Sequence, residues 1–289
     1  MKGSWNEAPE RLIAEEIKSF ILQSPANRLQ ETGGAIYEEP LVGFACGDDP
    51  LFQDYKRIIG TFYLTPQEVL KASGKLSVIS WILPKAREIR AANRRQKKYP
   101  ARAWSLGRWY GEALNDELKK RIVGLLQAQG FQAVAPTLTP AFQRPQLDSG
   151  PTSNWSERHT AYAAGLGTFS LSDGLITAKG IAMRCGSVVT DLALPPTPRP
   201  YAVHTANCLF YRDGSCNFCI SRCPSGAITE RGHDKKKCQQ HLRDNIAALK
   251  EEYGVETVGC GLCQTGVPCE ARIPVRGKLV PVAAGGTRA

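Results

Sequence analysis

The segments CLFYRDGSCNFCISRCPSGAI (residues 208–228) and GCGLCQTGVPCE (residues 259–270), with Cys238 between them, hold eight of the ten cysteines. The eight are Cys208, Cys216, Cys219, Cys223, Cys238, Cys260, Cys263 and Cys269. They fall within about a fifth of the 289-residue chain. Thiolates at this density and spacing are typical of a metal centre, so we expect the rest of the chain to fold around what they hold.

Cys216, Cys219 and Cys223, followed by Pro224, have the spacing that ends the bacterial ferredoxin run C-x2-C-x2-C-x3-C-P. In two-cluster ferredoxins the last cysteine of this run binds the other cluster. That crossed pattern gives two ligand sets for two [4Fe-4S] clusters. The first set is Cys208, Cys216, Cys219 and Cys269, and the second is Cys223, Cys238, Cys260 and Cys263.

Two departures from the ferredoxin pattern leave alternatives open. The nearest thiol upstream of Cys216 is Cys208, so Asp213 is an alternative oxygen ligand, and the second limb reads C-x2-C-x5-C. Zinc knuckles also use C-x2-C pairs, and disulfides would need an oxidising compartment. The Cys-Pro-Ser-Gly-Ala-Ile sequence after the third cysteine and the absence of an export signal favour iron-sulfur clusters.

Composition predicts a globular cytoplasmic protein with a basic surface. Hydrophobic residues make up 42% of the chain and charged residues 22%, and the formal net charge is +10. Two clusters of about −2 each would lower that charge to about +6, which favours an acidic partner such as a ferredoxin or flavodoxin, a phosphate-bearing cofactor, or nucleic acid. The N-terminus has no apolar signal region, and the longest apolar run, Leu76 to Leu83, is too short for a membrane span.

Helical and strand patterns alternate along the first two thirds of the chain, which predicts an α/β (α+β) body. We expect helices at 9–23, 51–59, 65–74, 115–129 (capped by Asn115), 156–164 and 234–250, and strands at 41–45, 76–83, 131–135, 175–177 and 183–192. The stiff segment Leu194 to Pro198 marks a domain boundary. The chain is thereby divided into residues 1–198, a cysteine-bearing module at 199–273, and a basic tail at 274–289.

Three further features need an interpretation. Lys85 to Arg108 carries nine basic residues and one acidic residue, for which a solvated helical face is favoured over a nucleic-acid surface. Pro136 to Pro151 is a long polar loop, of a kind that is either functional or disordered. Cys46 and Cys185, the two cysteines outside the cluster sets, are expected to be buried structural thiols.

Upstream of the cysteines, four short motifs follow one another. They are Leu147-Asp148-Ser149-Gly150-Pro151, Glu157-Arg158, Ala163-Ala164-Gly165-Leu166-Gly167, and Gly186-Ser187-Val188-Val189-Thr190-Asp191-Leu192-Ala193-Leu194-Pro195. The series resembles the D-S-x-P, E-R, A-G-L-G and G-x-x-x-x-D-x-P-L-P motifs of the epoxyqueuosine reductase family. Respiratory reductive dehalogenases share it more loosely. The resemblance runs from Ala101 to Cys269, cysteines included.

This resemblance implies a nitroreductase-like domain that binds base-off cobalamin, followed by a ferredoxin-like module. It also implies that Asp148 is the proton donor, whereas the residues alone would fit a turn. Tyr110, His159 and Tyr162 are reserve donors, for which a packed or surface role is favoured. The backbone at Gly165, Leu166, Gly167, Gly186 and Ser187 either approaches the phosphate tail of the corrinoid, as small residues allow, or forms simple turns. Arg184 is a candidate contact for the corrinoid carboxamides or phosphate, with a surface arginine as the alternative.

The implied function is a cobalamin-dependent reductase that acts on a modified nucleoside or a small organic molecule, with electrons from a ferredoxin or flavodoxin. Epoxyqueuosine reductases usually continue into helical repeats that help to hold tRNA, and dehalogenases usually carry a twin-arginine leader. This sequence has neither, so tRNA is a partner that the resemblance allows without requiring. The alternative is an electron-transfer or corrinoid-reducing protein with no substrate chemistry of its own.

Overall fold

A four-stranded antiparallel sheet lies at the centre of the computed structural model, which describes residues 7–275. In spatial order its strands are β1 (Leu41–Cys46), β2 (Ser77–Pro84), β8 (Met183–Thr190) and β3 (Ala133–Val134). β2 is buried along its whole length because strands flank it on both sides and helices cover both faces. The predicted mixture of helices and strands is confirmed, in its α+β form.

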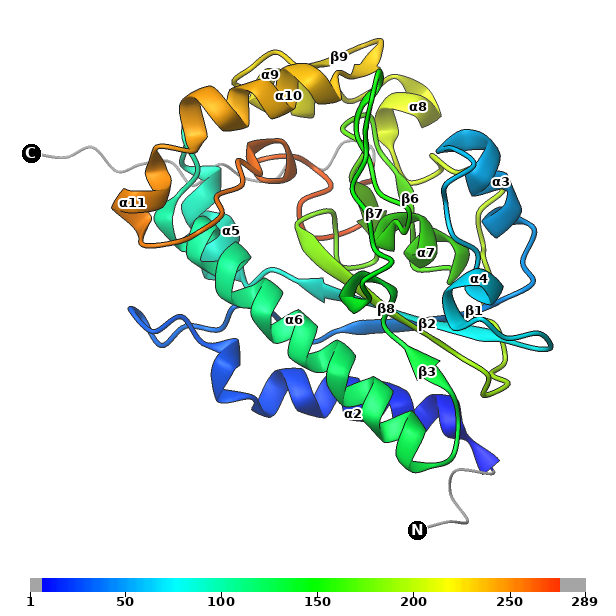
Figure 1. Ribbon diagram of the computed structural model, residues 1–289. Helices are drawn as coiled ribbons and strands as arrows, with labels where there is room; N and C mark the ends of the chain where they lie inside the picture. The colour runs from blue at the N-terminus through cyan, green and yellow to red at the C-terminus, as the bar shows by residue number, and fades with distance from the viewer. Residues whose placement is uncertain (1–6, 276–289) are drawn as a thin grey trace, which may run out of the picture.

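One face of the sheet is covered by α2 (Pro9–Gln23) and α6 (Arg102–Ala128), as Figure 1 shows. Ile13, Ile17 and Ile21 recur every four residues, so they form one stripe of α2 that is fully buried. This stripe packs into one core cluster with Trp81 of β2 and Leu118 of α6. The predicted helix at 9–23 is confirmed.

The opposite face is covered by α3 (Leu51–Ile58), α4 (Pro66–Leu70) and α7 (Glu157–Ala163) (Figure 1). Its core is aromatic. The Phe52 and Tyr63 rings each stack on Trp155, with centroids 6.1 and 6.2 Å apart. A small hairpin of β6 (Gly167–Phe169) and β7 (Leu175–Thr177) follows α7, and the predicted strand at 175–177 is confirmed.

The helix predicted at 115–129 begins thirteen residues earlier, at Arg102, so the assignment of Asn115 as its N-cap is wrong. Asn115 lies inside α6 and is fully buried. Its side-chain oxygen accepts a hydrogen bond from Trp81 Nε1 at 2.9 Å, and its amide donates to the Cys185 carbonyl at 3.0 Å. The residue therefore joins α6 to the two central strands.

The cysteine-bearing region is built from short elements. They are α8 (Leu209–Asp213), α9 (Phe218–Arg222), β9 (Ile228–Thr229), β10 (Gly232–His233), α10 (Lys235–His241), the π-helical segment η3 (Leu242–Ile246), α11 (Leu249–Tyr253) and the 3-10 turn η4 (Leu262–Gln264). Asp234 caps α10 by accepting from the Lys237 amide at 2.9 Å. The single helix predicted at 234–250 is wrong, because η3 separates α10 from α11.

Short segments complete the described chain. They are η1 (Pro25–Asn27), α5 (Arg87–Arg94), η2 (Pro136–Leu138), β4 (Gln146–Leu147) and β5 (Gly150–Pro151). The connector at 194–198 lies along β1, since Thr197 N donates to Phe44 O and Phe44 N donates to Thr197 Oγ1, both at 2.9 Å. The boundary predicted there remains a prediction, and the predicted tail lies outside the described residues beyond Val275. Within residues 7–275 no helix is both long and apolar enough to cross a membrane.

Candidate functional site

The first predicted set of cysteines lines one cavity. Cys208 stands at the N-terminus of α8, Cys216 and Cys219 bracket the start of α9, and Cys269 follows η4, and all four line the same small pocket. Leu209, Phe210, Ile176 and Val267 supply an apolar wall. Asp213 is not among the lining residues. Its carboxylate instead accepts a hydrogen bond from the Ser215 amide at 3.0 Å, so the geometry favours Cys208 as the fourth ligand.

The thiols of this set lie close enough to influence one another. Burial raises the pKa of Cys219 to about 12, and the neighbouring Cys208 and Cys216 add to the increase. Burial also raises the pKa of Cys269, with contributions from Cys208, Cys219 and Cys216. Thiols that are held together and resist ionisation lose their protons when they bind a cationic iron centre.

The second set is gathered in the same way. Burial raises the pKa of Cys260 to about 11, with further contributions from Cys238 and Cys223. The pKa of Cys263 is raised by burial and then by Cys260, Cys238 and Cys223. Cys219 of the first set also raises the pKa of Cys263, and the division of the eight cysteines into two ligand sets remains a prediction. None of the ten cysteines of the chain forms a disulfide.

Cys223 differs from the other thiols of its set. Burial raises its pKa, but the Ser225 hydroxyl and the backbone amides of Ile228, Ala227 and Ser225 outweigh burial and bring the pKa below its usual value. The Ser225 oxygen lies 3.3 Å from the Cys223 sulfur. Donors aimed at a sulfur suit a thiolate ligand, and such hydrogen bonds tune iron-sulfur centres. Across the described residues, no three His, Cys, Asp or Glu side chains are placed to bind a single metal ion.

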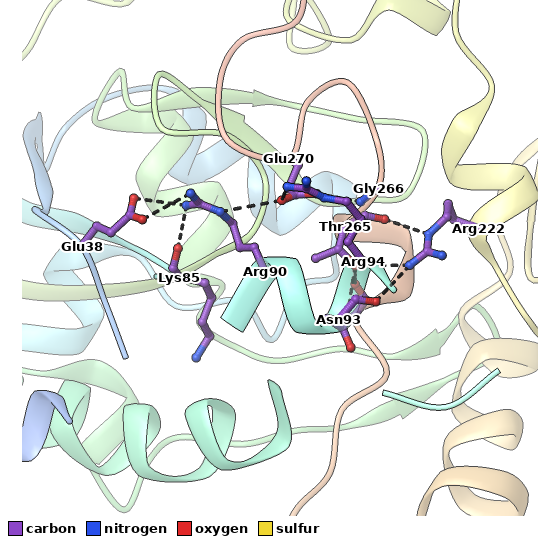
Figure 2. A network of polar contacts seen from close by, with 10 residues as sticks. Glu38, Lys85, Arg90, Asn93, Arg94, Arg222, Thr265, Gly266 and Glu270 are labelled. Carbon is purple, nitrogen blue, oxygen red and sulfur yellow. Dashed lines mark hydrogen bonds and ion pairs between the residues drawn. The ribbon is translucent and has the colours of Figure 1, made fainter. Parts of the chain in front are cut away.

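A polar network ties the loop between Cys263 and Cys269 to α5 (Figure 2). Glu270, 1% exposed, accepts from Arg94 Nε at 3.0 Å and from the Gly266 amide at 2.7 Å. Arg90 Nε lies 3.8 Å from the same carboxylate, and Arg90 also pairs with Glu38 at 3.2 Å. The loop that supplies one cysteine to each set is thus held by two arginines.

The prediction of a solvated face for the basic run Lys85 to Arg108 is wrong for Lys85 and Arg90 but holds for most of its basic residues, because Arg87, Arg95, Lys97, Lys98 and Arg102 are exposed. Lys85 and Arg90 are 4% and 7% exposed. Burial lowers the pKa of Lys85, as do Arg184 and Arg108 nearby, and its Nζ donates to the Gly107 carbonyl. Burial, together with Arg184, lowers the pKa of Arg108 to about 10. The two buried members of the run, Lys85 and Arg90, face the protein interior, where Lys85 contacts α6 and Arg90 lies beside Glu270.

Asp148 lies in the turn of the β4–β5 hairpin and is exposed. The hairpin packs on α10, which carries Cys238. A Cβ at Gly150 would stand 2.6 Å from the Lys235 Cβ, and Gln239 Nε2 donates to Gln146 Oε1 at 3.2 Å. The structure therefore brings the predicted proton donor to a helix of the second cysteine set.

The residues predicted to contact a corrinoid have contacts within the protein. A Cβ at Gly165 would meet the Pro198 carbonyl at 2.6 Å, one at Gly167 the Ile176 carbonyl at 2.5 Å, and one at Gly186 the Trp81 ring at 2.5 Å. Ser187 is buried and accepts from Trp155 Nε1 at 3.0 Å, and Arg184 pairs with Glu112. Close packing thus explains these glycines, and their contact with a corrinoid remains a prediction, as does that of the neighbouring Leu166.

The reserve donors and the two remaining cysteines are also placed. His159 lies between Tyr55 and Phe169, and Tyr162 packs against Phe169. Tyr110 is partly buried against the α2–α6 core. Burial raises the pKa of Cys185 to about 12, as expected of a structural thiol. Cys46 is only half-buried.

The sequence patterns missed a set of charged residues along α6 and its neighbours. Arg108, Glu112 and Lys119 recur on one side of α6, where Glu112 reaches Arg184 of β8. Arg108 Nε and an Oε2 of Glu157 are buried with no hydrogen-bond partner among the described residues. Burial raises the pKa of Glu157. Helical spacing could have aligned the α6 charges, but not their partners on β8 and α7.

Comparison with known proteins gives related sequences but no matching family model. An epoxyqueuosine reductase of Gloeobacter violaceus is 32% identical over 190 residues, which are 62% of this chain and 52% of that protein. Its counterpart in Bacillus anthracis is 32% identical over 123 residues, 40% of this chain and 30% of the relative. The chain spans about half or less of the length of these curated relatives.

Solved structures share the fold. A crystal structure of epoxyqueuosine reductase with an epoxyqueuosine-modified tRNA-Tyr stem loop has a TM-score of 0.52 at 19% identity, covering 90% of this chain and 65% of that one. A catabolic reductive dehalogenase in complex with 3-bromo-4-hydroxybenzoic acid has a TM-score of 0.53 at 13% identity, covering 92% and 37%. The resemblance to the superfamily of epoxyqueuosine reductases and reductive dehalogenases is confirmed.

Proposed function

We propose that this chain is an iron-sulfur, cobalamin-dependent reductase in which two [4Fe-4S] clusters deliver electrons to a base-off corrinoid. The observation that carries the proposal is the pocket lined by Cys208, Cys216, Cys219 and Cys269, with the thiols of Cys223, Cys238, Cys260 and Cys263 near one another, beside an α+β body. Sequence relatives named epoxyqueuosine reductases support the reaction class. In this proposal the body is the nitroreductase-like corrinoid domain, and the cysteine region is the ferredoxin-like module.

The roles of the residues follow from their positions. Cys208, Cys216, Cys219 and Cys269 hold one cluster, and the second set holds the other. Bound clusters would supply single electrons at low potential, and a bound corrinoid would supply the reductive chemistry toward an organic substrate. The charged side of α6, with the unpartnered Arg108 Nε, suits a ligand rich in amide and phosphate groups. In this proposal Asp148, exposed in the turn of the β4–β5 hairpin, donates a proton to the substrate.

The substrate class is a modified nucleoside or a small organic molecule. A tRNA-borne nucleoside is supported by the tRNA stem loop bound to the structurally similar epoxyqueuosine reductase. The net charge of +10 favours an acidic substrate carrier or an acidic ferredoxin or flavodoxin as donor. We place the protein in the cytoplasm, where its thiols stay reduced.

The proposal is tested by supplying the protein with iron-sulfur clusters and cobalamin and measuring what it retains. It is purified without oxygen, its clusters are rebuilt, and it is incubated with hydroxocobalamin and desalted. We expect about eight irons per chain and a retained corrinoid with the Co(II) EPR signal of the base-off form. About eight irons without retained corrinoid would favour the alternative, a two-cluster electron-transfer or corrinoid-reducing protein.

Replacing Asp148 distinguishes the proposed reductase from the alternative, an electron-transfer or corrinoid-reducing protein without substrate chemistry. Asp148→Asn should lower turnover at least 100-fold, the usual worth of a general acid, and leave iron content and electron transfer to the corrinoid unchanged. Asp54→Asn, at a surface carboxylate of α3, is the control and should retain full activity. Unchanged turnover in the Asp148 variant would remove this residue from the mechanism.

A further inference from the structure

Arg222, at the end of α9, is a cation that forms no ion pair with a carboxylate of residues 7–275. Its guanidinium donates to four backbone carbonyls, of Gln96 at 2.7 Å, Thr265 at 2.8 Å, Leu262 at 3.2 Å and Asn93 at 3.3 Å. The residue is partly buried. Arg90, Arg94 and eleven other Lys or Arg side chains form ion pairs within residues 7–275, but Arg222 is not among them.

The Arg222 guanidinium is held next to residues of the second cysteine set. Arg222 directly precedes Cys223 in the sequence, and two of its acceptors, Leu262 and Thr265, stand on either side of Cys263. Figure 2 shows the guanidinium next to Asn93 and Thr265, with Glu270 turned toward Arg94. The nearest carboxylate is therefore already neutralised by other arginines.

A partly buried charge needs compensation. Carbonyl oxygens satisfy the N–H groups of a guanidinium but carry no net charge, and removing a cation from water without a counter-ion is costly. A [4Fe-4S] cluster with four thiolates carries about −2 and would supply that counter-ion. The guanidinium keeps its charge at any physiological pH.

We infer that Arg222 is the electrostatic partner of the cluster held by Cys223, Cys238, Cys260 and Cys263, and that it raises the reduction potential of this cluster. The inference rests on the proposed function. Reduction adds a negative charge, so a fixed positive charge nearby stabilises the reduced form. The Asp148 hairpin packs on α10, which carries Cys238. A higher potential here would draw electrons toward the side of the molecule where the substrate is proposed to bind.

The test compares Arg222→Gln, Arg222→Lys and the wild type after anaerobic cluster reconstitution. Iron content is measured first, and the two midpoint potentials are then obtained by EPR-monitored redox titration. Arg231→Gln, at an exposed arginine of the same region, is the matched control because solvent and salt screen its charge. We expect Arg222→Gln to shift one midpoint potential to a more negative value, Arg222→Lys to restore most of it, and Arg231→Gln to leave both unchanged.

Loss of half of the iron in Arg222→Gln, with full iron content in Arg222→Lys, would also support the inference. The positive charge, and not the hydrogen-bond geometry of the guanidinium, would then be what retains the cluster. Unchanged potentials at full iron content would overturn it, as would equal shifts or equal iron loss in both variants, which would indicate a structural clamp. A wild-type chain that takes up no iron would refute the proposed function itself, whereas a loaded wild type with insensitive potentials would refute only the role of Arg222.

Discussion

At the scale of single residues, His159 provides a pH-dependent contribution to stability. Its ring lies 4.9 Å from the Tyr55 centroid and 4.8 Å from that of Phe169, and Nδ1 is 2.7 Å from Ser156 Oγ. Burial lowers its pKa to about 3, and Arg158, Lys235 and His204 act in the same direction against Asp173. The neutral imidazole is therefore favoured in the folded protein.

We expect the wild type to lose stability as the pH falls below about 6.5, since His159 then gains a proton only in the unfolded chain. Between its unfolded and folded pKa values, the free energy of unfolding should fall by up to about 1.4 kcal/mol per pH unit. His159→Gln removes this contribution. Chemical denaturation of both proteins at pH 7.0 and 5.5, with clusters intact, measures the difference, and parallel pH profiles would contradict the burial argument.

Residues that act through sequence neighbours could be predicted, and residues that act through distant partners could not. The spacing of Cys216, Cys219 and Cys223 is local, so the pattern alone indicated their grouping. The roles of Arg222 and Glu270 depend on distant partners: Arg222 contacts carbonyls, and Glu270 contacts arginines, that are 40 or more residues away in the sequence. Gly186 fits either a ligand or the Trp81 ring, and only the fold places the ring there.

At the scale of elements, α6 shows why a helix start was misplaced. Gly107 and Gly111 lie in its first half and weaken the helical pattern, because glycine is a poor helix former. In the fold both are needed for close approach. A Cβ at Gly111 would stand 2.4 Å from Tyr37 Oη, and one at Gly107 would stand 2.8 Å from Ile89 Cδ1. Tertiary packing therefore extends the helix through residues whose intrinsic preference opposes it.

The link between α6 and the sheet can be tested at Asn115. Asn115→Leu leaves the buried Trp81 N–H and the Cys185 carbonyl without partners, so we expect a loss of about 2–4 kcal/mol in the free energy of unfolding. Lys120→Ala, at an exposed position on the same helix, is the control and should change stability by less than about 0.5 kcal/mol. Denaturant titration measures both, and a similar small effect at Asn115 would mean that α6 is held by its apolar contacts alone.

At the scale of the whole molecule, the cysteine region is joined to the α+β body by backbone as well as side-chain contacts. Ile181 N donates to Cys269 O at 2.8 Å, and Phe169 N donates to His204 O at 2.7 Å. The proline-rich connector predicts a domain boundary near residue 198. No local pattern, however, could predict that the segment before β8 contacts Cys269. The cysteine loops therefore depend on the body for their shape.

Glu270 is the clearest point of that dependence. Glu270→Gln keeps the shape of the side chain but removes the charge that Arg90 and Arg94 face, and breaking a buried ion pair from one side costs about 3 kcal/mol or more. Glu270 accepts a hydrogen bond from the Gly266 amide, within the loop between Cys263 and Cys269. Because this loop supplies one cysteine to each predicted set, the variant should retain both clusters less well. We expect a lower thermal midpoint of unfolding, a lower iron content and weaker EPR signals from both clusters, in contrast to the single-cluster effect predicted for Arg222. Glu230→Gln, exposed in the same region, is the matched control, and iron loss confined to one cluster would show that the loop is not the shared support inferred from its two cysteines.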